Sequence, residues 1–254
     1  MQNKHKKELA VLLTTVIMSA LLMLCLAAEA PNDAEITVLK HAQAEGVSLQ
    51  AYPESLIALL DRNPEAKEFV LNYPFRQELE IDLSGCDLSQ GVPLLIQWDP
   101  RWGYRKYSGD FVGVTGCGPL CLSMAGYYLT GDPRFYPDKV LEFATKNGYA
   151  ADGSGSRWTL ISQGGRDLGL SVKEIAPEEK KVAAYLDSGA LIIAVMGPGD
   201  FTGTGHFIVL TGYEDGKVSV NDPNSYVNSE KQWKFASIKD QFRNLWIIQK
   251  GAEG

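Results

Sequence analysis

Apolar residues recur at helical spacing in the part of the chain that follows residue 30. The spacing predicts three short helices in a segment of residues 31–72, and the pair Asn63-Pro64 is typical of a helix start. These helices are expected at residues 34–44, 54–60 and 65–71. Residues 73–91 are polar, are punctuated by glycine and proline and lack periodicity, so we expect a linker. A domain is predicted to follow at residues 92–250.

The predicted domain begins with helical patterns and ends with strand-like ones. After an extended apolar run at residues 93–97, helices are expected at residues 120–129, 137–147, 157–168 and 178–186. Strands are expected at residues 191–196, 206–213, 217–221 and 245–249. Helices followed by consecutive strands indicate an α+β domain with an antiparallel sheet rather than alternating βαβ units.

The first thirty residues have the character of a targeting segment. Lysines among the first seven residues precede an uncharged apolar stretch at residues 9–28, which is the pattern of an export signal. About 20 apolar residues also suffice to cross a bilayer, and Pro31 is expected to obstruct signal cleavage after Ala28-Glu29-Ala30. We therefore expect residues 1–30 to be either a signal peptide or a retained membrane anchor. In both cases the remaining chain would be extracytoplasmic, either secreted or anchored to the outer face of the cytoplasmic membrane.

Charge and motif content narrow the possible partners. The chain has 24 basic and 31 acidic residues, a formal net charge of −7, and no basic patch, so we expect no nucleic-acid partner. The sequence has no Walker-type glycine loop, no CxxC pair and no His/Cys cluster with metal spacing. We therefore expect no cofactor and no metal. We expect membrane contact only through the N-terminal segment, and a monomer.

The segment Gly116-Cys117-Gly118-Pro119 carries the most informative cysteine. Proline is favoured in the first turn of a helix, and the flanking glycines allow a tight turn. A cysteine at a helix N-terminus has its thiolate stabilised by the helix dipole. After residue 30 the cysteines are Cys86, Cys117 and Cys121, an odd number that leaves at least one free thiol. The tetrapeptide alone fits either a nucleophile or a small buried thiol, whereas Cys121 is expected to face the core.

A cysteine nucleophile generally needs a histidine base and a group that orients the base. His206 opens a predicted strand and is the reasonable candidate base, since His41 lies in the N-terminal segment. We expect Glu214-Asp215-Gly216 to be a three-residue hairpin loop, which sets Asp222 across from Ile208 and on the face of His206. A two-residue loop would put the pair on opposite faces.

Acyl transfer also needs hydrogen-bond donors for the developing oxyanion. The backbone N–H of Cys117, at the predicted helix start, is one candidate donor. The side-chain amide of Gln97, at the end of the extended run, is the other.

Four motifs in this order resemble the papain-fold cysteine peptidases related to the bacteriocin leader (double-glycine) peptidases. The motifs are Gln97-Trp98-Asp99 with Trp102, Gly116-Cys117-Gly118-Pro119, Gly205-His206-Phe207-Ile208-Val209 and Asn221-Asp222-Pro223. Over residues 92–249 the sequence looks like the stand-alone, exported bacterial branch of these peptidases. The resemblance implies a papain-like fold, in which the nucleophile helix packs on a C-terminal antiparallel sheet. It implies Cys117 as nucleophile, His206 as base, Asp222 as orienting residue and Gln97 as oxyanion donor.

The resemblance also implies the location of the substrate cleft. The implied cleft residues are Trp98, Gly116, Trp158, Asp200, Phe201, Thr202 and Gly205. Residues 103–115 look like an insertion and are a further candidate lining. Leader peptidases are usually fused to an ABC transporter, but this sequence contains no ATPase motif and no series of apolar spans, which argues against leader processing.

Together these features predict an exported cysteine peptidase that forms a thioester acyl-enzyme on a peptide or protein substrate. A peptidoglycan peptide is one candidate substrate. The alternatives are a cell-wall amidase, endopeptidase or other acyl-transfer enzyme with the same residues, and a non-catalytic binding module of the same fold. Residues 31–72 are either an inhibitory pro-segment over the cleft or a spacer.

Overall fold

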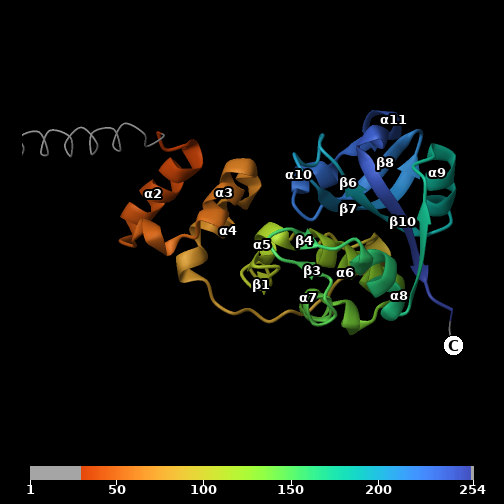
Figure 1. Ribbon diagram of the computed structural model, residues 1–254, viewed down its shortest axis with the longest axis horizontal. Helices are drawn as coiled ribbons and strands as arrows, with labels where there is room; N and C mark the ends of the chain where they lie inside the picture. Colours follow the sequence, from red (N-terminus) through yellow and green to blue (C-terminus); the bar gives the residue numbers. More distant parts are fainter. Residues whose placement is uncertain (1–29, 253–254) are drawn as a thin grey trace, which may run out of the picture.

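The computed structural model describes residues 30–252 of the chain (Figure 1). The expected signal peptide or anchor, with its apolar stretch at residues 9–28, lies outside the described residues. Among the helices of residues 30–252, none combines the length and the apolar character that a membrane crossing requires.

A six-stranded sheet forms the centre of the domain, with the strand order β5-β10-β6-β7-β8-β9. All neighbouring strands are antiparallel. The six strands are β5 (Leu170–Ile175), β6 (Leu191–Met196), β7 (His206–Glu214), β8 (Lys217–Asn221), β9 (Gln232–Lys234) and β10 (Phe242–Lys250). Every residue of β6 is buried, because this strand lies inside the sheet and helices cover both sheet faces. The predicted α+β class is confirmed.

Helices pack on the two faces of this sheet. One face carries α6 (Cys117–Thr130), with α7 (Pro137–Lys146) packed on its outer side, and the other face carries α9 (Glu179–Asp187) (Figure 1). Alternate strand residues serve the two cores, as the period of a strand requires. Val195 and Val209 face the α6 side, whereas Ala194 and Ile208 face the α9 side. The predicted packing of the cysteine helix on an antiparallel sheet is confirmed.

Short elements connect these layers. Two small ribbons pair β1 (Lys106–Tyr107) with β2 (Asp110–Phe111) and β3 (Ala150–Ala151) with β4 (Gly155–Ser156). The other short elements of the domain are α5 (Val112–Thr115), η5 (Pro133–Phe135), η6 (Leu160–Gly164), α8 (Gly165–Asp167), α10 (Tyr226–Glu230), α11 (Phe235–Ile238) and η7 (Lys239–Gln241).

The N-terminal segment is helical and packs against the domain beside α5 (Figure 1). It contains α2 (Asp33–Glu45), η1 (Leu49–Ala51), α3 (Glu54–Arg62), η2 (Pro64–Ala66), α4 (Lys67–Leu71) and η3 (Tyr73–Phe75). Asn32 and Glu35 form a capping box that starts α2, and the Asn63 side chain caps η2. The apolar side chains of this segment share one cluster with Ile96, Trp98 and Phe111 of the domain.

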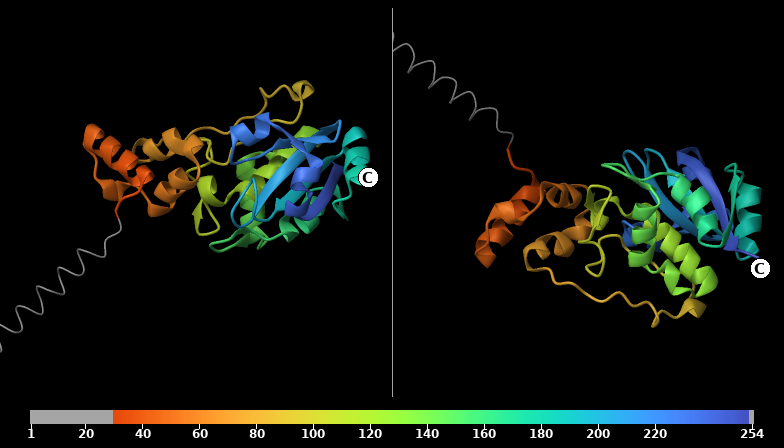
Figure 2. Two further views of the ribbon diagram at one scale, coloured as in Figure 1. Left: turned by 90° about the horizontal axis from the view of Figure 1, so that it is seen from above. Right: turned by 60° about the horizontal axis from the view of Figure 1, so that its bottom comes forward.

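Residues 76–91 run from the N-terminal segment along the outside of the α6 and α7 layer (Figure 2). They end in η4 (Leu88–Gln90). Leu83 is buried in the domain core, and its carbonyl accepts a hydrogen bond of 2.9 Å from the Tyr127 hydroxyl. This connection is therefore packed on the domain for part of its length.

Three local features differ from what the sequence indicated. Residues 93–96 form no strand, because the Asn221 side chain donates to the carbonyls of Val92 and Pro93 in place of a strand partner. The helix expected at residues 157–168 is present but begins later, and it consists of a π-helical turn, η6, continued by α8. Glycines at the junction allow close packing on Tyr149 and Val172. Strand β5, in which buried Leu170 and Val172 alternate with exposed residues, was assigned to no element by the sequence.

Candidate active site

The cysteine helix begins at Cys117 itself, directly after the short helix α5. Both flanking glycines are required by packing. A Cβ at Gly116 would lie 2.6 Å from the carbonyl oxygen of Val112, and a Cβ at Gly118 would lie 2.7 Å from Oγ of Ser156. The glycines therefore let α5 and β4 approach the start of α6 closely, while Cys117 remains partly exposed.

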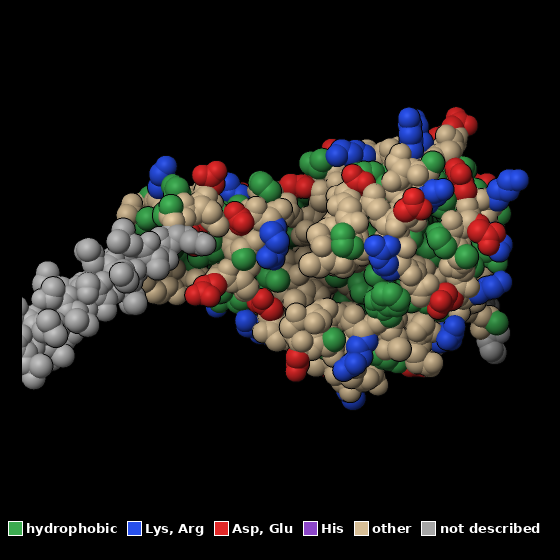
Figure 3. Space-filling model, turned by 45° about the horizontal axis from the view of Figure 1, so that its top comes forward, with side chains coloured by type: hydrophobic (Ala, Val, Ile, Leu, Met, Phe, Trp, Pro, Cys, Tyr) green, Lys and Arg blue, Asp and Glu red, His purple; other side chains and the backbone are tan. Residues whose placement is uncertain are grey.

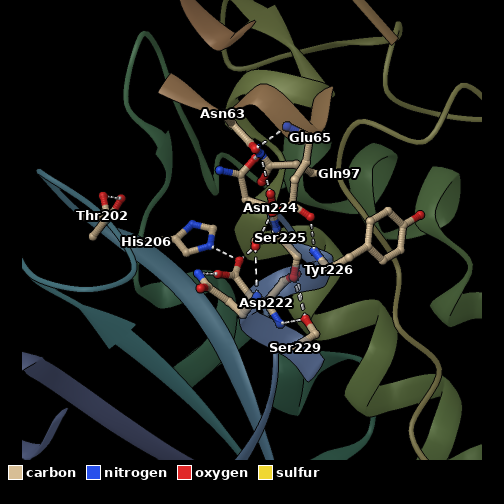
Figure 4. Close-up of polar contacts among 12 residues, drawn as sticks. Asn63, Glu65, Gln97, Thr202, His206, Asp222, Asn224, Ser225, Tyr226 and Ser229 are labelled. Atoms are coloured by element: carbon tan, nitrogen blue, oxygen red, sulfur yellow. Dashed lines mark hydrogen bonds and ion pairs between the residues drawn. The ribbon is translucent and has the colours of Figure 1, made fainter. Parts of the chain in front are cut away.

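His206 is the first residue of β7, and its side chain is 8% exposed. Nε2 of His206 lies 2.6 Å from Oδ1 of Asp222 (Figure 4). Cys117 and His206 line the same cleft and lie close enough for each to shift the pKa of the other. Because Nε2 faces Asp222, Nδ1 is the imidazole nitrogen left for the sulfur. The structure thus brings the three residues together, with His206 between the Cys117 thiol and the Asp222 carboxylate.

The hairpin that brings Asp222 to His206 differs from the expected one. Glu214 pairs with Lys217, so the loop has two residues, Asp215 and Gly216, both with positive φ (47° and 77°). The three-residue loop expected from the sequence is therefore wrong. A β-bulge at residue 211 adds one residue to β7, so Val209 still pairs with Asn221. Continuing this register sets Asp222 opposite residue 208, as expected.

Asp222 is 1% exposed and is held by the loop that follows it. Its Oδ1 accepts from the backbone N–H of Asn224, and its Oδ2 accepts from the Asn228 side chain, both at 2.8 Å. The Ser229 hydroxyl accepts from the Asp222 backbone N–H at 2.9 Å. Sequence reasoning missed Asn228, because nothing in the sequence marks a residue that is brought back by a one-turn helix.

The hydrogen bonds and charges of these residues shift their pKa values in opposite directions. Burial raises the pKa of Cys117, but the hydrogen bond and charge of His206 and the N–H groups of Phe207 and Gly118 outweigh burial, so the pKa is lowered. Burial lowers the pKa of His206, but the charge and hydrogen bond of Asp222, together with Cys117, raise it to about 10. Such shifts favour a thiolate–imidazolium pair at neutral pH.

The pKa of Asp222 is lowered, whereas the pKa of Cys121 is raised. Burial raises the pKa of Asp222, but the charge of His206 and the hydrogen bonds of the loop lower it overall, so Asp222 is ionised. Cys121 is fully buried, and burial raises the pKa of its thiol well above the ordinary value. The expectation that Cys121 faces the core is confirmed.

Gln97 lies in a turn rather than at the end of a strand. Its side chain is buried, and Nε2 donates to the carbonyl oxygen of Gly113 at 2.9 Å. Its Oε1 has no hydrogen-bond partner among the described residues. Turning the amide over would place Oε1 against the Gly113 carbonyl, so the bond to Gly113 fixes its orientation. The second hydrogen of Nε2 remains for another acceptor in the cleft.

A cleft of about 380 Å³ surrounds Cys117, His206 and Gln97. Its other lining residues come from several elements of the chain: Leu59, Arg62, Val114, Thr115, Gly153, Ser154, Gly155, Phe201, Thr202, Thr204, Gly205 and Asn224. Three of the cleft residues implied by the resemblance, Phe201, Thr202 and Gly205, lie in this lining, as do the last two residues of the 103–115 stretch.

The remaining implied cleft residues lie outside the lining. Gly116 adjoins Cys117 as the N-cap of α6. The Trp98 indole N–H donates to the carbonyl of Asn224, and Trp158 packs edge-on against Trp246. Asp200 is hydrogen-bonded to Gln241.

Leu59 and Arg62 were not implied by the sequence, because they belong to the N-terminal segment and reach the cleft only through tertiary packing. Within residues 30–252, no group of three or more His, Cys, Asp or Glu side chains is arranged to hold a metal ion.

A cysteine at the start of a helix, a histidine at the start of a strand and a carboxylate directly after the neighbouring strand are arranged here as in a cysteine peptidase. Residues 89–253 match the model of the Peptidase_C39 like family, and the chain belongs to this family. No curated protein matches the sequence.

Solved structures of low sequence identity are similar to this chain. A protein assigned as a C39-like peptidase from Bacillus anthracis is 14% identical, and the match covers 69% of this chain and 100% of that one with a TM-score of 0.44. The peptidase domain of Streptococcus ComA, a bifunctional ABC transporter of a quorum-sensing pathway, is 16% identical, with 54% and 93% covered and a TM-score of 0.41. A double-glycine motif protease from an AMS/PCAT transporter, in complex with its leader peptide, is 20% identical, with 53% and 84% covered and a TM-score of 0.38.

Proposed function

We propose that this cysteine peptidase hydrolyses an amide bond of a peptide or protein substrate through the thiolate of Cys117. One observation carries the proposal. The thiol of Cys117 and the imidazole of His206 lie together in the lining of one cleft, and the imidazole is hydrogen-bonded to the buried carboxylate of Asp222. A non-catalytic module of this fold would have no need to keep these three groups together.

The reaction proceeds in two stages on these residues. The Cys117 thiolate attacks the substrate carbonyl, and the new oxyanion accepts hydrogen bonds from Nε2 of Gln97 and the N–H of Cys117. The His206 imidazolium then donates its Nδ1 proton to the amine as the C–N bond breaks, which leaves a thioester. In the second stage neutral His206 takes a proton from water, the hydroxide attacks the thioester, and the acid product leaves as the thiolate re-forms.

Asp222 orients the base and stabilises its charged form. Its bond to Nε2 keeps Nδ1 directed toward Cys117, and its negative charge offsets the positive charge of the imidazolium in a buried setting. The buried carboxylate stays ionised because the loop of residues 224–229 satisfies its oxygens. Asp222 therefore acts through His206 and does not touch the substrate.

The proposal includes export of the enzyme. The apolar stretch at residues 9–28 with lysines before it supports this placement. Cys86, Cys117 and Cys121 are all free thiols, so folding of the described chain requires no disulfide. The proposed enzyme acts outside the cytoplasm, either secreted or held at the membrane by its N-terminus.

The test is a digest of a synthetic peptide library by the wild-type chain and by Cys117→Ala, read by mass spectrometry. Purified peptidoglycan is treated in parallel to detect release of cell-wall peptides. We expect cleavage products that are absent with Cys117→Ala. Equal product patterns from both proteins would overturn the proposal, and products from peptidoglycan alone would assign the enzyme to the cell wall.

A further inference from the structure

The aromatic ring of Phe69 packs the N-terminal segment against the domain. Phe69 of α4 stacks on Tyr104 with 4.2 Å between ring centroids. A Cβ at Gly103 or Gly113 would lie 2.7 or 2.8 Å from the Phe69 ring, so two glycines of the domain leave the space that this ring fills. The Tyr104 hydroxyl donates to the carbonyl of Phe69 at 2.7 Å. This fit indicates a specific interface within the chain.

Polar contacts hold the same segment at the loop that follows Asp222. The Asn63 side chain donates to the carbonyl of Asn224 at 2.6 Å, and the Glu65 carboxylate accepts from the backbone N–H groups of Tyr226 and Val227 (Figure 4). These contacts lie beside the cleft and leave Cys117 and His206 in its lining. The segment thus forms a wall of the cleft and does not fill it.

The C-terminal end of helix α3 is the part of this wall that lines the cleft. Leu59 and Arg62 line the cleft together with Cys117. The Arg62 side chain is exposed and makes no hydrogen bond or ion pair with any described residue. Among the described residues that line the cleft there is no aspartate or glutamate, and the ionisable groups besides Arg62 are Cys117 and His206. The negative charges of the Cys117 thiolate and of Asp222 both face the His206 imidazolium. The Arg62 guanidinium therefore has no carboxylate partner among the described residues that line the cleft.

We propose that Arg62 forms a subsite that selects a carboxylate of the substrate, either an acidic side chain or a free C-terminus. The inference rests on the proposed peptidase function and names a substrate class for it. A guanidinium pairs with a carboxylate through two parallel hydrogen bonds, which gives direction as well as attraction. Residues 31–72 are then a resident part of the cleft and supply specificity, rather than a spacer or a removable cover.

The first test uses the active-site thiol and needs no substrate. The full chain is alkylated at pH 7 with iodoacetate or with iodoacetamide, and the modification of the Cys117 peptide is followed by mass spectrometry. In both reactions the thiolate forms the S–C bond as iodide leaves, so only the charge of the reagent differs. We expect the ratio of the iodoacetate rate to the iodoacetamide rate to fall about threefold in Arg62→Gln and further in Arg62→Glu.

Lys67→Gln is the matched control. Lys67 lies on the same segment, is exposed, lies outside the cleft lining, and its loss changes the net charge equally. We expect Lys67→Gln to keep the wild-type ratio. An equal ratio in the wild type, Arg62→Gln and Arg62→Glu would overturn the subsite.

The second test uses paired synthetic peptides that carry Glu, Gln or Lys at each position around the cleaved bond. We expect the wild type to prefer Glu at one position, Arg62→Gln to lose that preference about fivefold, and Arg62→Glu to favour Lys. Cleavage with unchanged preferences in the variants would refute the subsite and leave the peptidase standing. A changed alkylation ratio without cleavage of any peptide would support the subsite and refute the peptidase.

Discussion

Nε2 of His206 lies 2.6 Å from Oδ1 of Asp222, although the two-residue loop between their strands would by itself put the side chains on opposite sheet faces. The bulge at residue 211 restores the register, so the pair depends on an irregularity in β7. Bulges that re-aim side chains are common next to active sites. The base and its orienting residue are therefore set by backbone geometry as well as by residue identity.

In Asp222→Asn, the loss of activity on the basic side of the pH profile is expected to occur at a lower pH than in the wild type. The charge of Asp222 raises the pKa of His206, whose value is about 10 in the folded protein. The imidazolium exists below this pKa, so on the basic side of the profile the wild type loses activity as the pH rises through about 10. Without the carboxylate, the basic limb moves toward the ordinary histidine pKa, and kcat/KM falls by about 10²-fold at neutral pH.

The measurement is kcat/KM against pH for the wild type and Asp222→Asn. Asp200→Asn is the control, because Asp200 adjoins the cleft residue Phe201 but is hydrogen-bonded to Gln241 and makes no hydrogen bond or ion pair with His206. A basic limb that is the same in the wild type and Asp222→Asn would show that the carboxylate does not set the His206 pKa.

The residues of the proposed chemistry were the part of the site that the sequence could predict. Cys117 and His206 stand at the start of a helix and of a strand, so local patterns locate them. The predicted position of Asp222 is correct, but the predicted loop is one residue too long. The β-bulge that compensates for the shorter loop has no signature in the sequence. The sheet was predicted through its central strands, whereas β5 and β9 at its edges were not, since short half-exposed strands have weak patterns.

The cleft wall could not be predicted from the sequence. Arg62 and Glu65 are ordinary charged residues of short helices, and both lie far from Cys117, His206 and Asp222 in the sequence. Their position depends on Phe69 entering the space above Gly103 and Gly113, which is a property of tertiary packing. Gly103 and Gly113 did not predict this packing, because the sequence alone does not distinguish a glycine required by close packing from a glycine required by a turn.

Gln97→Ala is expected to reduce kcat by about 10²-fold with little change in KM, because the lost donor acts on the oxyanion rather than on the bound substrate. Gln97→Glu is expected to be at least as severe, since the carboxylate keeps the shape but offers no N–H and faces the developing negative charge. Steady-state kinetics on one peptide substrate measure both variants. An effect confined to KM would assign Gln97 to substrate binding instead.

Cys117→Ala is expected to abolish labelling by iodoacetamide near neutral pH, whereas Cys121→Ala is expected to keep it. The pKa of Cys117 is lowered by its contacts with His206, but burial raises the pKa of Cys121. The reactive form is the thiolate, so only Cys117 reacts readily. Mass spectrometry of the labelled peptides separates these sites from Cys86. Equal labelling of the two variants would contradict the assignment.

Gly126→Ala is expected to destabilise the domain although alanine is the better helix former. The new Cβ would overlap the ring of Phe135, which is 1% exposed and closes the outer side of α6. Overpacking costs about 1–3 kcal/mol, while the gain in helix propensity is about 1 kcal/mol, so a net loss of about 1 kcal/mol is expected. Urea unfolding measures the change. Gly85→Ala, where a Cβ meets nothing within 4 Å, is the control and should leave the unfolding midpoint in place.

Glu65→Ala is expected to act on the base through the loop that holds Asp222. Glu65 accepts hydrogen bonds from Ser225, Tyr226 and Val227 at the start of α10, and Asn228 of that helix donates to Oδ2 of Asp222. Loss of the carboxylate leaves these N–H groups without their acceptor, loosens the loop and weakens the hold of Asp222 on His206. We expect kcat/KM to fall about tenfold and the basic limb to move to lower pH, in the direction of Asp222→Asn.

Glu65→Gln separates a positioning role from a general loss of stability. The amide oxygen can still accept from the two backbone N–H groups, and the amide nitrogen can face the Ser225 hydroxyl, so this variant should recover most of the activity and the wild-type basic limb. Glu35→Ala removes an equivalent carboxylate from the capping box of α2, away from the cleft, and should lower only the stability of the N-terminal segment. If Glu65→Ala and Glu35→Ala lose stability equally and both keep the wild-type pH profile, Glu65 has no influence on His206.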